Sequence, residues 1–236
     1  MRLCMFHPVD RPMERGWVGR IDDDQVVHLA AQTLQSFFTG GGTAREHDVY
    51  PLEAVRLLAP VLHPPAVRIF DEQESFSFAN PAAIVGPESV VAARPSPRGS
   101  EPRGDRLMIL PRLAAVVGAN EAIGGFTALA EWRAPSRRAP KDRDFALGLG
   151  PTVVTRDAFR PDGVGALVRV GAGLELTGAF VGFDWAAALA LAREGTILKP
   201  SDLLAGPALG IVDVGSPGTV EIEVESIGIL AATVAS

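Results

Sequence analysis

Short apolar runs separated by glycine and proline fill the chain beyond about residue 65. These frequent interruptions limit the fold of the chain more than any other feature. The sequence holds 25 Gly and 19 Pro, residues that interrupt helices and end strands. The runs include residues 82–86, 113–118, 152–155 and 220–225. In the last run Val220, Ile222 and Val224 alternate with glutamates, which predicts a strand with those three side chains facing the core. We therefore predict an α+β fold that is mostly β.

The N-terminal part of the chain follows a different pattern. Residues 17–29 predict a β-hairpin, because an Asp-rich turn at Asp22 to Asp24 separates two runs rich in β-branched residues. Residues 34–38 and 52–58 have helical spacing, with glycines between them. This part therefore reads as a small α/β region with a hairpin and helices.

Prolines mark a boundary after this region. Pro60, Pro64 and Pro65 follow the second helical run, and two consecutive prolines hold the chain extended. We predict a small N-terminal domain of residues 1–59 and a C-terminal domain of residues 60–236.

One helix is predicted among the later strands, at residues 184–195. Asp184 is suited to cap its N-terminus and Gly195 to end it. Residues 94–105 and 133–143 predict polar loops, the second one basic. Residues 163–173 are glycine-rich but precede no helix, so they predict a turn-rich β segment and not a dinucleotide site.

Composition excludes several classes of function. Hydrophobic residues make up 47% of the chain and charged residues 21%, and no apolar run approaches the roughly 20 residues that span a bilayer. A net charge of −6 argues against nucleic-acid binding. A single cysteine, Cys4, permits no internal disulfide, and the first residues show no secretory signal. We expect a cytoplasmic protein with small-molecule or protein partners.

Seven segments, taken in order, resemble the fumarylacetoacetate hydrolase family. They are residues 57–65, 78–87, 113–118, 125–131, 141–151, 198–210 and 220–230. The segment at 125–131 resembles the family's "GYTIANDVSARD" motif, the one at 141–151 its "KSFDTFCPLGP" motif, and the one at 198–210 its "LxPGDLILTGTPAG" motif. The resemblance implies a mixed β-roll with few helices, usually dimeric. It also implies cleavage or rearrangement of carbon–carbon bonds in dicarbonyl or 2-oxo acid substrates with a divalent metal, usually magnesium.

The metal ligands that the resemblance implies are largely absent. A Glu-x-Glu pair precedes the family's "LAVVIG" strand, and aligning Leu113 with the leucine of that strand places Leu110 and Arg112 at the two glutamates. A leucine offers no lone pair, and a guanidinium repels a cation. The third ligand aligns with Glu131, which keeps a carboxylate. One carboxylate does not hold magnesium, so we expect neither a metal nor another cofactor.

Other catalytic parts of the family also lack counterparts. The histidine that relatives carry soon after the paired prolines is missing, and His7, His28, His47 and His63 match no catalytic position. The threonines of the "TGTP" loop are replaced in the segment Ala205-Gly-Pro-Ala, which keeps only Gly206 as a candidate substrate contact.

The remaining residues suggest a reduced site. By resemblance, Glu131, Lys141 and Asp144 are candidate catalytic residues, and Arg112 and Arg68 join Gly206 as candidate substrate-binding residues. If Arg112 and Lys141 converge near Glu131, fixed positive charge could replace magnesium in holding a carboxylate or enolate. Alternatively, Arg112 and Glu131 simply pair and close the site.

Two functions are consistent with this site. The first is a metal-independent enzyme that acts on a small oxo acid or dicarbonyl-like molecule by C–C cleavage, decarboxylation, isomerisation or cyclisation. The second is a catalytically inactive protein of the same fold that binds a ligand or serves as a partner subunit. We expect a homodimer, or a heteromer with an intact paralogue.

Overall fold

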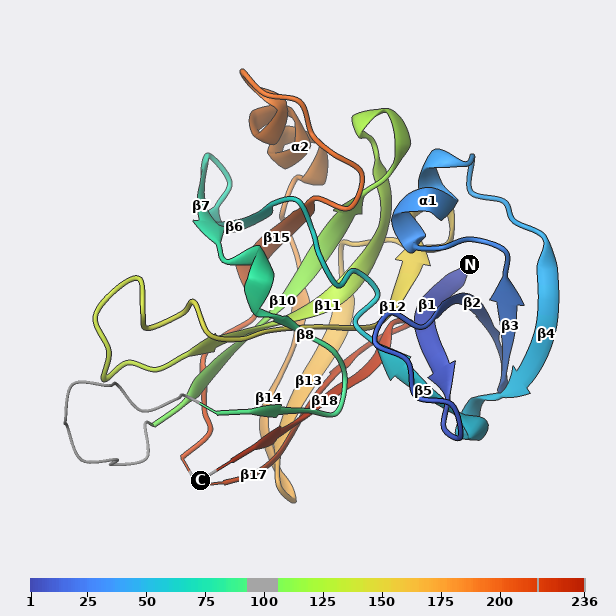
Figure 1. The fold of residues 1–236 in the computed structure, drawn as a ribbon. Helices are drawn as coiled ribbons and strands as arrows, with labels where there is room; N and C mark the ends of the chain where they lie inside the picture. Colours follow the sequence, from blue (N-terminus) through green and yellow to red (C-terminus); the bar gives the residue numbers. More distant parts are fainter. Residues whose placement is uncertain (93–105, 216, 236) are drawn as a thin grey trace.

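Two β-sheets and two helices make up the part of the chain that the computed structural model describes, residues 1–92, 106–215 and 217–235 (Figure 1). The larger sheet has 13 strands and the smaller has five. Both contain parallel and antiparallel pairs. The mostly β, mixed-sheet fold predicted from the sequence is confirmed.

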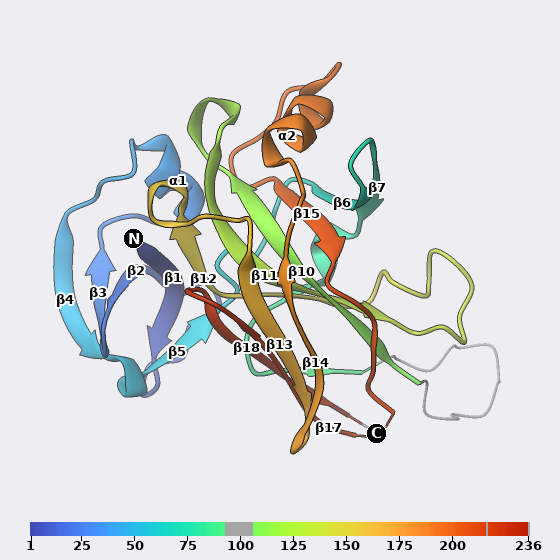
Figure 2. The ribbon, with the colours of Figure 1, turned by 180° about the vertical axis from the view of Figure 1, so that it is seen from behind.

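The large sheet runs from an N-terminal meander into three long central strands. Its path is β4-β3-β2-β1-β12-β11-β10-β15-β6-β7, with β5 beside β1, β8 beside β12 and β16 beside β10. The strands are β1 (Arg2–Pro8), β2 (Trp17–Asp22), β3 (Gln25–Leu29), β4 (Glu46–Pro51), β5 (Val55–Leu58), β6 (Val67–Glu72), β7 (Ser75–Ala79), β8 (Ile84–Val85), β10 (Met108–Val117), β11 (Ile123–Arg133), β12 (Leu147–Thr155), β15 (Leu203–Ala208) and β16 (Val212–Asp213). Figure 2 shows the meander on one side of the long strands β10 and β11.

The strand β10 is buried along nearly its whole length because both faces of the sheet are covered. Leu113, Ala115 and Val117 belong to one apolar core, and Ala114 and Val116 belong to another. This alternation follows from the two-residue period of a strand. It means that neighbouring residues of β10 serve opposite sides of the sheet.

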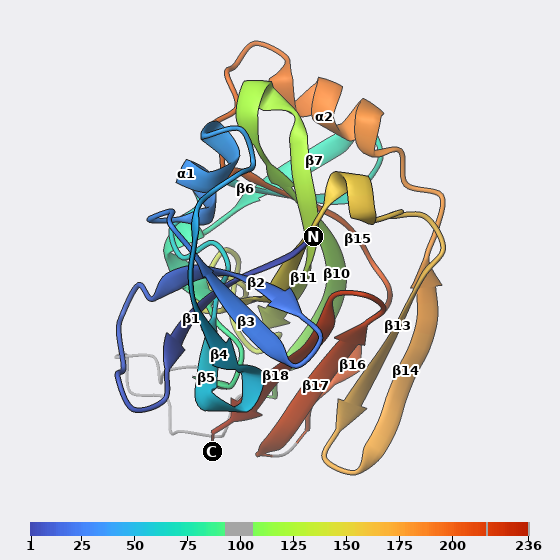
Figure 3. The same ribbon diagram turned by 90° about the vertical axis from the view of Figure 1, so that its right-hand side faces the viewer.

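The small sheet packs with α2 over the first of these cores. Its order is β14-β13-β17-β18-β9. The strands are β9 (Ser89–Val91), β13 (Val164–Val170), β14 (Gly173–Phe180), β17 (Gly218–Val224) and β18 (Gly228–Val234). Val220, Ile222 and Val224 are each 1% exposed, which confirms the predicted core face of this strand. Figure 3 shows β13 and β14 at the right of the molecule and α2 above them.

The two helices are short, and both were predicted. In α1 (Leu34–Thr39), Thr33 caps the first turn. In α2 (Trp185–Arg193), the Asp184 carboxylate accepts hydrogen bonds from the backbone N–H groups of Ala186 and Ala187. Gly195 follows this helix with φ of +67°. No helix among the described residues is long and apolar enough to cross a membrane.

The prediction of a helix at residues 52–58 is wrong. Residues Leu52–Ala54 form one short 3₁₀ turn, and β5 follows as a strand. Its register pairs Leu58 with Met5 and Val55 with Pro8 of β1. Pairing with β1 therefore overrides the helical spacing, because intrinsic helix preference is weak beside tertiary contacts.

Other predicted segments have mixed outcomes. The hairpin of β2 and β3 is confirmed, as is the loop between β11 and β12. Residues 163–173 contain strand β13 and the turn that leads into β14, so they are a β segment, as expected. The predicted loop at residues 94–105 lies outside the described residues. The sheet continues from β1 to β12, while the division into domains at residues 59 and 60 stays a prediction.

Candidate functional site

The candidate site is built on two neighbouring long strands. In the antiparallel register of β10 and β11, Leu110 lies opposite Glu131 and Arg112 lies opposite Leu129. Residues two apart on a strand share a face, so Leu110, Arg112 and Glu131 all lie on one side of the sheet. The strand geometry thus brings together the three positions that the sequence comparison singled out.

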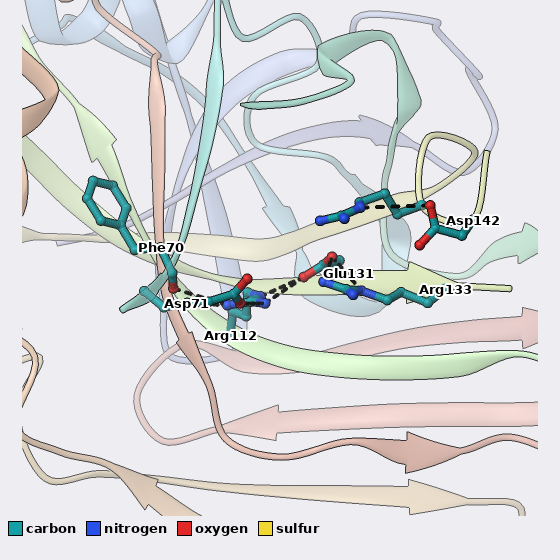
Figure 4. Close-up of polar contacts among 8 residues, drawn as sticks. Phe70, Asp71, Arg112, Glu131, Arg133 and Asp142 are labelled. Carbon is teal, nitrogen blue, oxygen red and sulfur yellow. Dashed lines mark hydrogen bonds and ion pairs between the residues drawn. The ribbon is translucent and has the colours of Figure 1, made fainter. Parts of the chain in front are cut away.

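Arg112 is the centre of this arrangement and is fully buried, with 0% of its surface exposed. Its Nε donates to Oε2 of Glu131 at 2.8 Å. Its Nη2 donates to Oδ1 of Asp71 at 2.6 Å and lies 2.7 Å from the same glutamate oxygen. Its Nη1 donates to the carbonyl oxygens of Phe70 and Gly206, at 3.3 and 3.0 Å. Every nitrogen of the guanidinium therefore has a partner (Figure 4).

Glu131 is held from both sides. Arg112 contacts its Oε2, and Arg133 donates to its Oε1 from Nε at 2.8 Å. Glu131 is only 1% exposed, whereas the Asp71 side chain is 60% exposed. Two arginines and two carboxylates thus form a group with no net charge, which we call the arginine cluster: Arg112, Arg133, Glu131 and Asp71. A buried charge that is paired and hydrogen-bonded in this way is stable in the protein interior.

The arginine cluster does not fit a divalent metal. A hard cation such as magnesium needs several oxygen ligands, and in the described part of the chain no group of three or more His, Cys, Asp or Glu residues could hold one. The guanidinium of Arg112 also lies against the Glu131 oxygen that would be a ligand. Positive charge at that distance would repel a cation.

Lys141 and Asp144 pair with each other, away from the described contacts of the arginine cluster. They lie in the loop between β11 and β12, and Nζ of Lys141 is 2.6 Å from Oδ2 of Asp144. The Lys141 side chain is 75% exposed. Among the described contacts, those of Lys141 bring it to Asp144 and not to Glu131.

Arg68 and Gly206 occupy different surroundings. Arg68 is buried and donates to Oδ2 of Asp202 at 3.2 Å, and its guanidinium lies over the rings of Phe76 and Phe78. The carbonyl of Gly206 accepts from Arg112, while its Cα side faces the ring of Trp185. Of these two candidate residues, Gly206 touches the arginine cluster through its backbone.

Sequence reasoning missed Asp71 and Arg133. Arg133 stands two residues after Glu131 on the same strand, so the two-residue period could have placed both on one face. Asp71 comes from β6, in the segment where a catalytic histidine was sought. Nothing in the sequence spacing links it to Arg112, since 41 residues separate them.

No protein-family model and no curated protein matches the sequence, but several solved structures match the fold. The maleylpyruvate hydrolase of Sphingobium sp. SYK-6 superposes with a TM-score of 0.77 at 20% identity. The fumarylacetoacetate hydrolase of the psychrophilic Exiguobacterium antarcticum gives 0.78 at 20%, and a 5-carboxymethyl-2-hydroxymuconate delta-isomerase of Mycobacterium smegmatis gives 0.77 at 21%.

Each of these matches covers 100% of this chain and 99% of the other. At such low identity the likeness concerns the fold, and it extends from the N-terminal meander to the last strand. The chain therefore has the fold of the fumarylacetoacetate hydrolase family, in a divergent form.

Proposed function

We propose that this protein is a catalytically inactive member of the fold, which acts by binding a ligand or as a partner subunit. The observation that carries the proposal is the saturation of Arg112, whose Nε, Nη1 and Nη2 all have protein partners. A guanidinium has five N–H donors and no acceptor. With its donors engaged and its surface buried, Arg112 acts as a cross-link between strands.

Binding a substrate there would require breaking the cluster. A carboxylate or enolate could reach Arg112 only by displacing the exposed Asp71 side chain or the buried Glu131. Breaking the buried pair with Glu131 costs about 3–5 kcal/mol before the contacts of the ligand itself offset it. The two hydrogen-bonded carbonyls, of Phe70 and Gly206, would have to move as well. These contacts support a structural role for Arg112 over a role as a substrate anchor.

The loss of metal chemistry is part of the same proposal. A structure of the Sphingobium maleylpyruvate hydrolase is described as a complex with manganese(II) and pyruvate. In this chain a leucine and an arginine stand at the positions that we align with the family's two strand glutamates, beside Glu131. The chain would therefore provide one carboxylate of the implied three.

The test combines metal binding and turnover. Calorimetry with manganese(II) should show no stoichiometric binding at micromolar concentration, and the protein should release no pyruvate from maleylpyruvate, with or without the metal. The Sphingobium hydrolase serves as the positive control. Tight one-to-one manganese binding would overturn the alignment of Leu110 and Arg112, and pyruvate release above the buffer rate would overturn the inactive assignment.

A metal-free activity on a small oxo acid is the second candidate function, and one observation favours it. Lys141 and Asp144 stay paired in a loop where the lysine is open to solvent, so a general acid and an anion contact are accessible. Turnover without metal that is abolished in a Lys141→Met variant would establish this alternative. We expect either form to be cytoplasmic and to act as a homodimer or beside an intact paralogue.

A further inference from the structure

A cavity of about 190 Å³ lies beside α2, at the edge between the two sheets. Its main walls are Leu113, Phe180, Phe183, Trp185, Pro207 and Leu209. Among the described residues that line it, none carries a charged side chain, and the indole N–H of Trp185 is the one polar side-chain group. The cavity is thus apolar and bordered by aromatic rings.

This cavity lies on the opposite face of β10 from the arginine cluster. Leu113 forms part of its wall, whereas its neighbour Arg112 points to the other side of the sheet. Gly206 separates the two: its carbonyl accepts from Arg112, and its Cα faces the ring of Trp185. The cavity is therefore a second site and does not depend on the proposed function of the arginine cluster.

The aromatic walls are held in fixed orientations. The rings of Phe183 and Trp185 lie 4.8 Å apart at 86°, and Trp185 makes a second edge contact with Phe126 at 5.1 Å. Phe183 also packs against Phe70 at 5.7 Å. Such edge-to-face contacts fix the ring planes. A flat ring could therefore enter without reordering the walls, which lowers the entropic cost of binding.

We propose that this cavity binds a neutral, flat molecule with one or two rings. An apolar cavity of about 150 Å³ lined by aliphatic and aromatic side chains is known to take up benzene, so 190 Å³ suits a ligand of this size. A carboxylate would find no charged partner in the lining and would lose its hydration. The site therefore selects against the oxo acids that the fold suggests for the other face.

The proposal is tested with indole as the neutral probe and indole-3-carboxylate as its charged counterpart. Titration calorimetry and ligand-observed NMR on the full chain should show indole binding at one site. The carboxylate should bind at least about tenfold more weakly. Absence of indole binding at millimolar concentration would overturn the proposal, and so would equal affinity for the two probes.

Two pairs of variants locate the site. Phe183→Ala removes one aromatic wall and should weaken indole binding at least about tenfold. Phe78→Ala removes a phenylalanine that lies outside the cavity and is 67% exposed. This variant should change the affinity for indole less than about twofold. Equal loss in both variants would contradict the assignment.

The second pair of variants adds a methyl group at two glycines where the added Cβ would lie equally close to a neighbouring side chain. Neither variant removes a side chain from the core. A Cβ at Gly206 would lie 3.1 Å from the Trp185 ring, and one at Gly210 would lie 3.1 Å from Leu176. Gly206→Ala should weaken indole binding, and Gly210→Ala should leave it unchanged. If Gly206→Ala instead dissociates an oligomer in light scattering and indole does not bind, the cavity receives a second copy of the chain and the ligand proposal falls. None of these results decides whether the arginine cluster is catalytically inactive, because that proposal is tested separately by manganese binding and pyruvate release.

Discussion

Arg112 brings a permanent positive charge into the protein interior, and its neighbours determine whether that charge is tolerated. Glu131 and Asp71 supply the compensating negative charge, from a buried and a largely exposed side chain respectively. Two backbone carbonyls take the remaining donors. Removing the arginine would therefore leave Glu131 with Arg133 as its one described cation.

We expect Arg112→Met to lower the free energy of unfolding by about 3–5 kcal/mol, because it removes one partner of a buried ion pair. Urea denaturation followed by circular dichroism measures this change. Arg56→Met is the matched control, since Arg56 and its partner Glu88 are both exposed, and such pairs contribute about 0–1 kcal/mol. Equal losses in the two variants would show that Arg112 has no special structural role.

The double variant Arg112→Met and Glu131→Met separates the charge effect from packing. A hydrophobic pair of similar volume often replaces a buried ion pair at little cost, so the double variant should recover part of the stability lost by Arg112→Met. The recovery should be incomplete, because the carbonyls of Phe70 and Gly206 lose their donor.

At the scale of residues, the sequence could predict the ion pair of Arg112 and Glu131 but not the other groups that contact Arg112. Arg112 and Glu131 lie on strands that the family motifs place in order, so their pairing was one of two interpretations. Asp71 and the Gly206 carbonyl reach Arg112 from β6 and β15. Contacts between distant strands depend on sheet order, and local spacing carries no signal of it.

At the scale of elements, a helix or strand can be predicted from the sequence when the residues that determine it are close together in the chain. The cap at Asp184 and the period-two pattern of β17 are local, and both were predicted. Strand β5 forms because it pairs with β1, which lies about 50 residues earlier in the sequence. A residue pattern that reads as a helix in isolation can therefore be a strand when an edge is available.

The N-terminal meander contains an element with a testable pH response. His28 on β3 stacks on Trp17 of β2 at 4.7 Å and lies 5.0 Å from His47 of β4. Partial burial, and then the neighbouring His47, lower the pKa of His28 below its ordinary value, although Asp48 opposes this. The unfolded chain thus binds a proton on His28 more readily than the folded chain does.

The stability that this stack provides should be present above the ordinary histidine pKa of about 6.5 and lost as pH falls below it. In wild type the melting temperature should drop between about pH 7.5 and pH 5, and His28→Phe should reduce that drop because the ring stays but cannot be protonated. His63→Phe, at an exposed position in the linker, is the control. A drop that persists unchanged in His28→Phe would assign the pH response to other groups.

At the scale of the whole molecule, the apolar core and the candidate site are built from different residues. The apolar clusters on the two faces of the large sheet are built from valine, leucine, alanine and phenylalanine of many strands, and none of the four residues of the arginine cluster belongs to them. The fold can therefore persist while the residues at the ligand positions change. This explains how a chain with 20% identity to a hydrolase superposes on it over its full length.

The same separability predicts that a metal site can be rebuilt on this scaffold. Leu110 lies directly opposite Glu131, and Arg112 shares their face. Replacing Leu110 and Arg112 by glutamate would place three carboxylates together, a set of oxygen ligands suited to manganese or magnesium. We expect the Leu110→Glu and Arg112→Glu double variant to be less stable without metal, because buried carboxylates repel one another.

Manganese(II) should then raise the melting temperature of that variant in a concentration-dependent manner, since a ligand that binds only the folded state stabilises it. The control is the double variant with glutamine at both positions, which has the same shape and no added charge, and its melting temperature should not respond to manganese. Wild type should also show no response. If the glutamate variant folds but its melting temperature is insensitive to the metal, Glu131 does not occupy the position of a ligand, and the family alignment of this strand pair would have to be revised.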